Sequence, residues 1–359
     1  MMRHVVKIRS TFLTLFLGFL GGIIFYILKF PMPWLIGPMV MLALIAFHGK
    51  VEINMPSNIR NSMLALLGLM VGSTINPEVI THIPKWWLTF MLLIPLLITQ
   101  LFVAFVFLKY TLKKEHPATR FFGSAPGGLI EMITLTRENK GDERSVLIMH
   151  ILRLSALVFI TPILFQLSSI PSSQSRQLHD ITSGLIQYGF WNMMLLIVCV
   201  LAGVYGGRIL RLPAATVLGP FVLSSIFYGT DILQADPPFA LMILAQMVVG
   251  AGLGTRFAGY TLQNMQKLIL PTLLLTGIFM LISAGFAFLG QLLTPLPYGT
   301  IFLAYMPGGM TQMSIIALTL DLNAGFVMTH LMGRVFMVVI LAPICYKIII
   351  KRLEKVRRL

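Results

Sequence analysis

Charged residues are scarce in this sequence. Asp, Glu, Lys and Arg make up 11% of its 359 residues, whereas soluble globular proteins carry about 25%. That shortage excludes an ordinary soluble domain, and the apolar share of 57% excludes intrinsic disorder, which requires low hydrophobicity. A membrane-spanning helix uses ~20 mainly apolar residues, so the chain has room for about ten spans and little else. The composition therefore predicts an all-α polytopic membrane protein.

Cysteines and clustered histidines are also lacking. The two cysteines, Cys199 and Cys345, lie in apolar runs and are too few for a disulfide framework or a cysteine-based metal site. The seven histidines have no metal-ligand spacing, and no nucleophile motif occurs. Metal chemistry needs clustered His, Cys or carboxylate ligands. We therefore predict no metal, no cofactor and no enzymatic activity; a membrane-embedded enzyme such as an oxygenase is the least favoured alternative.

Apolar runs divide the chain into ten candidate spans and two interrupted segments. The candidate spans are 11–28, 33–48, 61–75, 86–108, 145–167, 181–206, 214–229, 238–255, 268–290 and 324–347. The interrupted segments, 119–138 and 298–320, each hold a Pro-Gly-Gly triplet. Proline removes a backbone donor and glycine tolerates unusual dihedral angles, so each triplet is expected to break a helix. The alternative is that the triplet only kinks a packed helix.

The basic residues, which give a net charge of +15, predict the topology. Lys and Arg concentrate in cytoplasmic loops. If both interrupted segments are re-entrant and the N-terminus is inside, 22 of the 27 basic residues face the cytoplasm; if both cross completely, only 16 do. We therefore predict re-entrant segments, and a multi-pass protein of the plasma membrane with both termini cytoplasmic. The basic stretch 347–358 is predicted to lie against anionic lipid rather than nucleic acid.

The sequence repeats itself at an offset of about 180 residues. The matching features are Gly37-Pro38 with Gly219-Pro220, Pro126-Gly127-Gly128 with Pro307-Gly308-Gly309, and Arg153 with Arg334. This pattern predicts a first membrane repeat over 11–167 and a second over 181–350, with a linker at 168–180 and a basic cytoplasmic tail at 351–359. An odd number of crossings per repeat would make the two five-helix repeats inverted, an arrangement that recurs in secondary transporters with broken helices.

Two arginines inside spans are the first candidates for a binding site, because ionisable groups within a membrane are costly and commonly functional. A broken helix also exposes free N–H groups at its new N-terminus, and these bind anions. The predicted substrate-binding residues are Arg153, Arg334, Gly127, Gly128, Gly308, Gly309, Glu131 and Gln312. The structural alternative is that the arginines are packing residues paired with Glu131 or with the carbonyl groups of the broken segments.

Four residues are candidates for proton or ion coupling: Glu131, His150, His330 and Asp142. Histidine titrates near neutral pH, and each histidine lies within one helical turn of an intramembrane arginine. The alternatives are a hydrogen-bonded interior histidine and, for Asp142, an acidic group that stabilises a helix start.

The doubled Pro-Gly-Gly segments, Gly141-Asp142, Arg153 and the two Gly-Pro pairs together resemble the duplicated AbrB family of integral membrane proteins. The resemblance covers about residues 12–350. Family members are commonly described as regulators of AidB or as ammonia monooxygenase-related proteins, and the resemblance implies a polytopic membrane protein without established catalytic residues. The second half departs from the pattern, because Asp321-Leu322-Asn323 stands where the first half has its Gly-Asp element.

These observations predict a secondary transporter of a small, anionic solute. A membrane-bound regulator that affects gene expression indirectly, without transport, is the alternative. The expected partners are the lipid bilayer and the solute, with no nucleic acid, and a homo-oligomer stays open.

Overall fold

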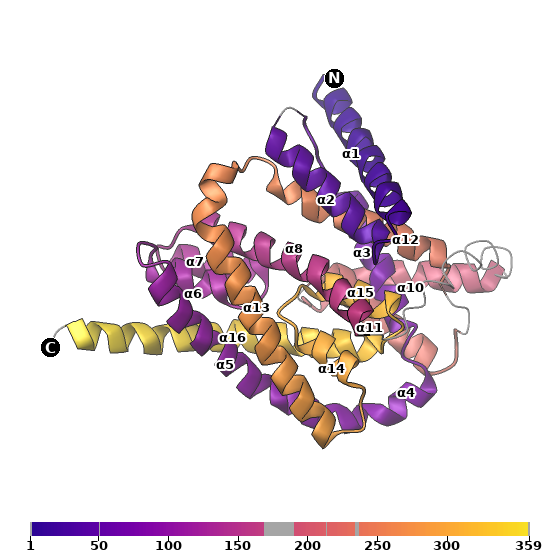
Figure 1. Cartoon of the computed structure of the whole chain (residues 1–359). Helices are drawn as coiled ribbons and strands as arrows, with labels where there is room; N and C mark the ends of the chain where they lie inside the picture. Colours follow the sequence, from indigo (N-terminus) through magenta and orange to yellow (C-terminus); the bar gives the residue numbers. More distant parts are fainter. Residues whose placement is uncertain (1, 50, 169–189, 213, 234–236, 358–359) are drawn as a thin grey trace. The chain divides into compact units, whose positions relative to one another are not determined.

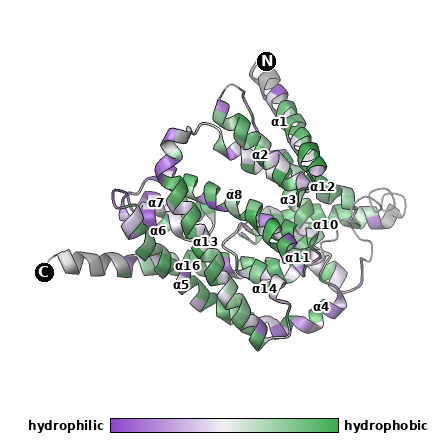
Figure 2. Cartoon of the chain, viewed as in Figure 1, coloured by the Kyte–Doolittle hydropathy of each residue, from purple (hydrophilic) through white to green (hydrophobic). Residues whose placement is uncertain are grey.

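The computed structural model describes every residue except 1, 50, 169–189, 213, 234–236 and 358–359. The described residues form helices and no strand. Seven of the described helical segments are long and apolar enough to cross a membrane, and three more are apolar but shorter. Figure 2 shows apolar residues along most of these helices. The chain is therefore a helical, multi-pass membrane protein, while the count of ten spans stays a prediction.

The long helices follow the predicted apolar runs. Their bounds are α1 (Met2–Ile27), α2 (Pro33–His48), α3 (Ser57–Gly72), α5 (Trp87–Thr111), α8 (Glu143–Leu167), α10 (Phe190–Ile209), α11 (Ala215–Gly229), α12 (Phe239–Gly254), α13 (Leu262–Leu293) and α16 (Ala324–Arg357). Short helices α4 (Pro77–His82) and η1 (Ile83–Trp86) precede α5, and η3 (Thr255–Phe257) follows α12. The predicted linker 168–180 lies, apart from Ser168, outside the described residues, as does the start of the predicted span 181–206.

Both Pro-Gly-Gly triplets interrupt a helix, as predicted. The first lies between α6 (Pro117–Ser124) and α7 (Leu129–Glu138), and the second between α14 (Tyr298–Tyr305) and α15 (Met310–Thr319). We call these interruptions the first break and the second break. Whether the segments re-enter or cross a membrane stays a prediction.

The chain forms two compact units, each assembled from three stretches of sequence. Unit 1 holds Met1–Lys85, Val158–Thr261 and Thr311–Gly325, and unit 2 holds Trp86–Leu157, Leu262–Met310 and Phe326–Leu359. Each unit therefore draws on both predicted repeats, and the repeats themselves stay a prediction.

Within unit 1, helices pack closely at glycines. α1 lies against α2 and α10 against α11, while α2 also contacts α12 and α3 contacts α11; the first of these pairs is visible in Figure 1. A methyl group on Gly68 would overlap the carbonyl oxygen of Val217, and one on Gly250 would overlap that of Leu35. Only glycine allows two backbones to approach this closely, so these positions set the distances between the helices.

Within unit 2, α5 packs against α6 and α13, and α13 packs against α14. The first break is anchored in an apolar cluster that includes Phe121, Phe122 and Met132 from the broken segment and Val338 and Tyr346 from α16. Burial of this cluster holds the ends of α6 and α7 in place, because apolar surface removed from water contributes ~25 cal/mol per Å².

Candidate functional site

Arg153 caps the end of the half-helix before the first break. Its side chain, from the middle of α8, is 4% exposed. Nη1 donates hydrogen bonds to the carbonyl oxygens of Ser124 at 2.8 Å and Ala125 at 3.1 Å. The last carbonyls of a helix have no partner within the helix, and a cation there also offsets the negative end of the helix dipole. Arg153 therefore satisfies backbone groups that the break exposes.

Arg334 has the same role at the second break. It extends from α16, is 2% exposed, and donates to the carbonyl oxygens of Met306 and Gly308. Met306 directly follows the last residue of α14. The two predicted arginines therefore each bind the C-terminal end of a broken helix.

Among the described residues, no carboxylate forms a salt bridge with Arg153 or Arg334. The salt bridge found there joins Arg137 to Glu143. The Nε atoms of Arg153 and Arg334 are buried without a hydrogen-bond partner, and both arginines belong to unit 2. A buried charge without a counter-ion is costly. Of the two structural alternatives, pairing with carbonyls is observed and pairing with Glu131 is not; the role of the arginines in binding a solute stays a prediction.

Glu131 lies at the start of the half-helix that follows the first break. It is the third residue of α7, is half-buried, and places its carboxylate over Gly128. Negative charge at a helix N-terminus is stabilising. A Cβ on the neighbouring Gly127 would clash with Val338 of α16, so this glycine fits a close contact inside unit 2.

Gln312 has the corresponding place after the second break, as the third residue of α15, and is 8% exposed. The first turn of α15 holds no acidic residue. Gln312 falls in unit 1, whereas the other predicted site residues, including Gly308 and Gly309, fall in unit 2. The structure therefore brings most of the predicted site residues into one unit, with Gln312 in the other.

Both predicted histidines are buried. Each ring Nδ1 lies against the carbonyl oxygen four residues earlier, Val146 at 3.0 Å for His150 and Phe326 at 2.9 Å for His330. His330 has a second partner in Thr89 of α5, with Nε2 and Oγ1 3.0 Å apart. The alternative of a hydrogen-bonded interior histidine therefore describes their contacts, and a coupling role stays a prediction.

Asp142 begins α8. Its carboxylate accepts hydrogen bonds from the backbone N–H groups of Arg144 and Ser145, both at 3.1 Å, and from the Ser145 hydroxyl at 2.5 Å. This is the geometry of a helix N-cap. Nearby, the Glu143 carboxylate accepts two hydrogen bonds from Arg137 and raises the pKa of that guanidinium. These contacts favour a structural role for Asp142, and its predicted coupling role stays a prediction.

A group of buried polar residues near the second break is absent from the predicted site. The Tyr305 hydroxyl donates to the Thr89 carbonyl oxygen at 2.6 Å, the Ser283 hydroxyl donates to the Tyr305 carbonyl oxygen at 2.9 Å, and Gln100 Nε2 donates to Ser283 Oγ at 3.2 Å. Gln100 could have been identified from the sequence, because a polar side chain within an apolar membrane segment is a candidate functional residue. Hydroxyl side chains give a weaker signal, because they can bond to their own helix.

The residues that the structure describes contain no group of three or more His, Cys, Asp or Glu side chains able to hold a metal ion. The predicted site combines two buried arginines and the ends of the broken helices with the Glu131 carboxylate and the Gln312 amide.

These features define a class: multi-pass helical membrane proteins with two interrupted helices, each capped by a buried arginine. The family model described as "Transition state regulatory protein AbrB" matches residues 34–350, and the chain belongs to this AbrB family. It is 24% identical to the "Putative regulator AbrB" of Escherichia coli (strain K12), over 91% of this chain and 92% of that protein. It is 23% identical to the "Uncharacterized protein YhjN" of Bacillus subtilis (strain 168), over 92% of this chain and 90% of that one.

Proposed function

We propose that this protein is a secondary transporter of a small anionic solute in the plasma membrane, and that the two breaks with Arg153 and Arg334 form its binding site. The observation that carries the proposal is the pair of buried guanidiniums without a carboxylate partner among the described residues. An anion between or beside them would supply the missing negative charge. Binding without a fixed counter-ion also suits transport, because the solute can leave again.

A duplicated architecture supports this proposal. Left-handed backbone, with φ between 49° and 66°, recurs at offsets of 181 or 182 residues. The pairs are Lys29 with Arg211, Met32 with Ala214, Gly49 with Asp231, and Lys140 with Asp321. Such φ values are uncommon outside glycine, so their recurrence favours two copies of one fold.

Two contacts inside unit 1 are related by the same offset, with the two halves of the sequence exchanged. Gly72 lies against the carbonyl oxygen of Phe221, and Gly254 lies against that of Met39. Adding 182 to each residue number of one contact, or subtracting it, gives the other. A two-fold relation between repeats produces such exchanged contacts, and inverted repeats with broken helices are typical of secondary transporters.

Binding is tested first, and transport second. Purified protein is first screened by thermal shift against succinate, glutamate, phosphate and ammonium, and the anion that stabilises it most is radiolabelled and offered to proteoliposomes. Arg153→Gln and Arg334→Gln keep hydrogen-bond donors but remove the charge, and each is expected to reduce uptake at least tenfold. Arg137→Gln is the matched control, because this arginine is exposed in an ion pair with Glu143. Uptake equal to wild type in both buried variants would reject the site.

A regulatory role without transport is the second candidate, favoured by the word "regulator" in the name of the Escherichia coli relative. Removing residues 348–359 distinguishes the two functions. A docking role for the basic tail predicts that regulation is lost while folding and membrane insertion are retained, and a transporter predicts that uptake survives the truncation.

A further inference from the structure

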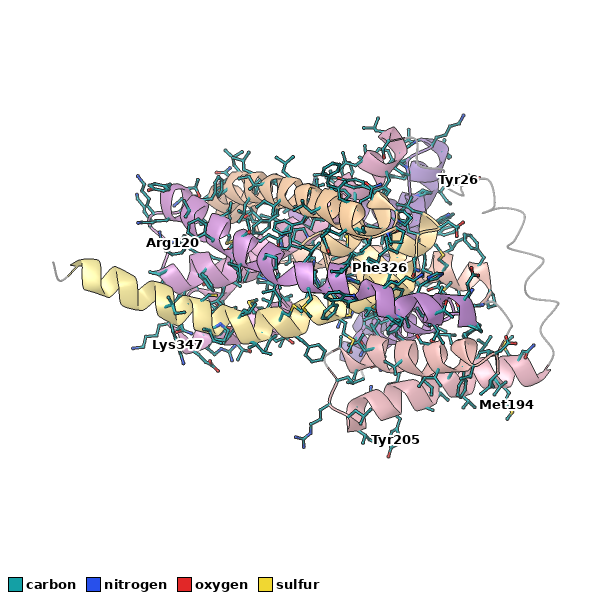
Figure 3. The ribbon with its side chains drawn as sticks, turned by 90° about the horizontal axis from the view of Figure 1, so that it is seen from below. Tyr26, Arg120, Met194, Tyr205, Phe326 and Lys347 are labelled. Carbon is teal, nitrogen blue, oxygen red and sulfur yellow. The ribbon has the colours of Figure 1, made fainter. Side chains whose placement is uncertain are left out.

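His330 lies in a closed polar and aromatic environment next to the second break. The imidazole is fully buried, and so are Thr89 and Tyr305. All three belong to unit 2. His330 extends from α16, whose first turns are marked by Phe326 in Figure 3.

The hydrogen bonds of His330 allow its protons to be counted. The Phe326 carbonyl oxygen can only accept, so Nδ1 carries a hydrogen. Nε2 faces the Thr89 hydroxyl at 3.0 Å, and that hydroxyl also lies 2.8 Å from the carbonyl oxygen of Trp86. A hydroxyl has one hydrogen, so it can donate to His330 or to Trp86 but not to both.

Protonation resolves this competition. With a neutral ring, Nε2 accepts the Thr89 hydrogen and the Trp86 carbonyl loses its hydroxyl donor. With a proton on Nε2, the ring donates to Thr89 Oγ1, and the hydroxyl hydrogen turns to the Trp86 carbonyl. Every contact is then a complete hydrogen bond, so the geometry accommodates an imidazolium and uses Thr89 as a switch between two hydrogen-bonding states.

Aromatic rings surround the same imidazole. The ring centroids of Phe326 and Phe90 lie 3.9 and 5.7 Å from that of His330, and those of Tyr305 and Trp86 lie 6.3 and 6.5 Å away. Aromatic faces attract a cation within about 6 Å, and the rings of Phe326 and Phe90 lie within this distance. Among the described residues, the titratable side chain that lies against His330 is Tyr305 of α14, and the charged Arg334 lies one turn further along α16. From α5, Thr89 and Phe90 contact the ring, with Trp86 just before them.

The switch is connected to the second break. Tyr305, the last residue of α14, donates its hydroxyl hydrogen to the Thr89 carbonyl oxygen. Arg334, one turn beyond His330 on the same helix face, donates to the carbonyl oxygen of Met306 directly after α14. His330 is therefore linked to the end of α14 through Thr89 and Tyr305, and Arg334 contacts the same end from one turn further along α16.

We propose that His330 is a proton-binding site, and that Thr89 and Tyr305 link its protonation to the end of α14 at the second break. Resting on the proposed function, this site would make the transporter proton-coupled. An anion beside Arg334 would offset the repulsion between Arg334 and a protonated His330, so proton and anion would favour each other's binding reciprocally.

The first break lacks this network. At the offset of 181 residues, Met149 stands in place of His330 and Ser124 in place of Tyr305. Ser124 donates its hydroxyl hydrogen to the Phe121 carbonyl oxygen of its own helix. The network of Thr89, His330 and Tyr305 is therefore confined to the second break.

Trp86 provides an optical test, because a protonated imidazole quenches a neighbouring indole. Trp34, Trp87 and Trp191 are replaced with Phe, and the fluorescence of Trp86 is titrated with pH in detergent, without any solute. We expect a one-proton transition that His330→Gln abolishes. Thr89→Val, which removes the hydroxyl acceptor of the ring proton, should move its midpoint to lower pH by about 1 unit, whereas Thr89→Ser should leave it in place.

Two results would overturn the proposal: no transition in the wild-type background over the pH range where the protein keeps its monodisperse elution profile, or a transition that persists in His330→Gln. A Thr89→Val midpoint equal to that of Thr89→Ser would overturn the link through Thr89, even if His330→Gln failed to fold. Because the titration needs no solute, its failure is distinguishable from failure of anion transport.

Discussion

The first and second breaks share a backbone arrangement and differ in the polar groups around it. At each break a short helix ends, an arginine from a later long helix donates to the exposed carbonyls, and a second short helix begins after two glycines. Glu131 then follows the first break, whereas the buried amide of Gln312 follows the second. A duplicated scaffold can thus keep its supporting contacts while its chemistry diverges, so differences between equivalent positions indicate function better than the shared features do.

Removing either arginine should have the largest effect on stability. Arg153→Met and Arg334→Met each leave two buried carbonyls without their donor, at about 1–3 kcal/mol per group, so each variant should lose about 2–6 kcal/mol. Chemical unfolding in mixed micelles, followed by circular dichroism, measures the loss. Similar losses would support a shared capping role; wild-type stability in Arg153→Met alone would show that only the second break depends on its arginine.

Substitution of equivalent glycines of unit 1 should reduce stability equally in the two halves of the sequence. Gly68→Ala and Gly250→Ala each force a methyl group against a backbone carbonyl, and overpacking of this kind costs about 1–3 kcal/mol. Gly277→Ala is the matched control, since a Cβ there meets no atom within 4 Å. Unequal losses, measured by thermal unfolding in detergent, would argue against a two-fold arrangement in unit 1.

The start of α8 should tolerate conversion to its counterpart in the other half. Asp142→Ala removes an N-cap and should cost about 1 kcal/mol, while Asp142→Asn, which copies the residue at 323, should be nearly neutral. The same unfolding measurement compares them. If Asp142→Asn preserves stability but abolishes uptake, the carboxylate has a coupling role beyond capping.

Removing the negative charge at the start of α7 should give the smallest change in stability. Glu131→Gln makes the first break resemble the second and should cost about 0.3–1 kcal/mol of helix-dipole stabilisation. A loss of uptake much larger than this change in stability would instead identify Glu131 as part of the transport mechanism. The reverse variant, Gln312→Glu, adds a carboxylate at a buried position and tests whether the two breaks are interchangeable.

Much of the fold could be predicted because its signals are local in sequence. Apolar runs located the long helices, although α1 begins well before its predicted span and α16 ends well after its own. The Pro-Gly-Gly triplets located both breaks, since proline and glycine act on their own backbone. Burial of Arg153 and Arg334 followed from their positions inside apolar runs. Their bonding partners did not, because the carbonyls of Ser124 and Met306 lie 29 and 28 residues away in sequence.

The buried polar network was the main omission. Thr89 and Tyr305 are unremarkable in sequence, and they meet His330 across separations of 241 and 25 residues. Gln312 was grouped with the other site residues by symmetry, yet it belongs to the other compact unit. Symmetry in sequence thus identified equivalent positions but not the neighbours that each position acquires.

The sequence by itself determined that this chain is helical, multi-pass and interrupted at two places, because hydrophobicity and backbone conformation are properties of each stretch taken alone. Only the tertiary structure decided which groups the arginines satisfy and which histidine acquires a threonine hydroxyl and four aromatic rings, one of them a tyrosine, as neighbours. Those contacts depend on how α5, α14 and α16 pack, and packing joins residues that no local pattern connects.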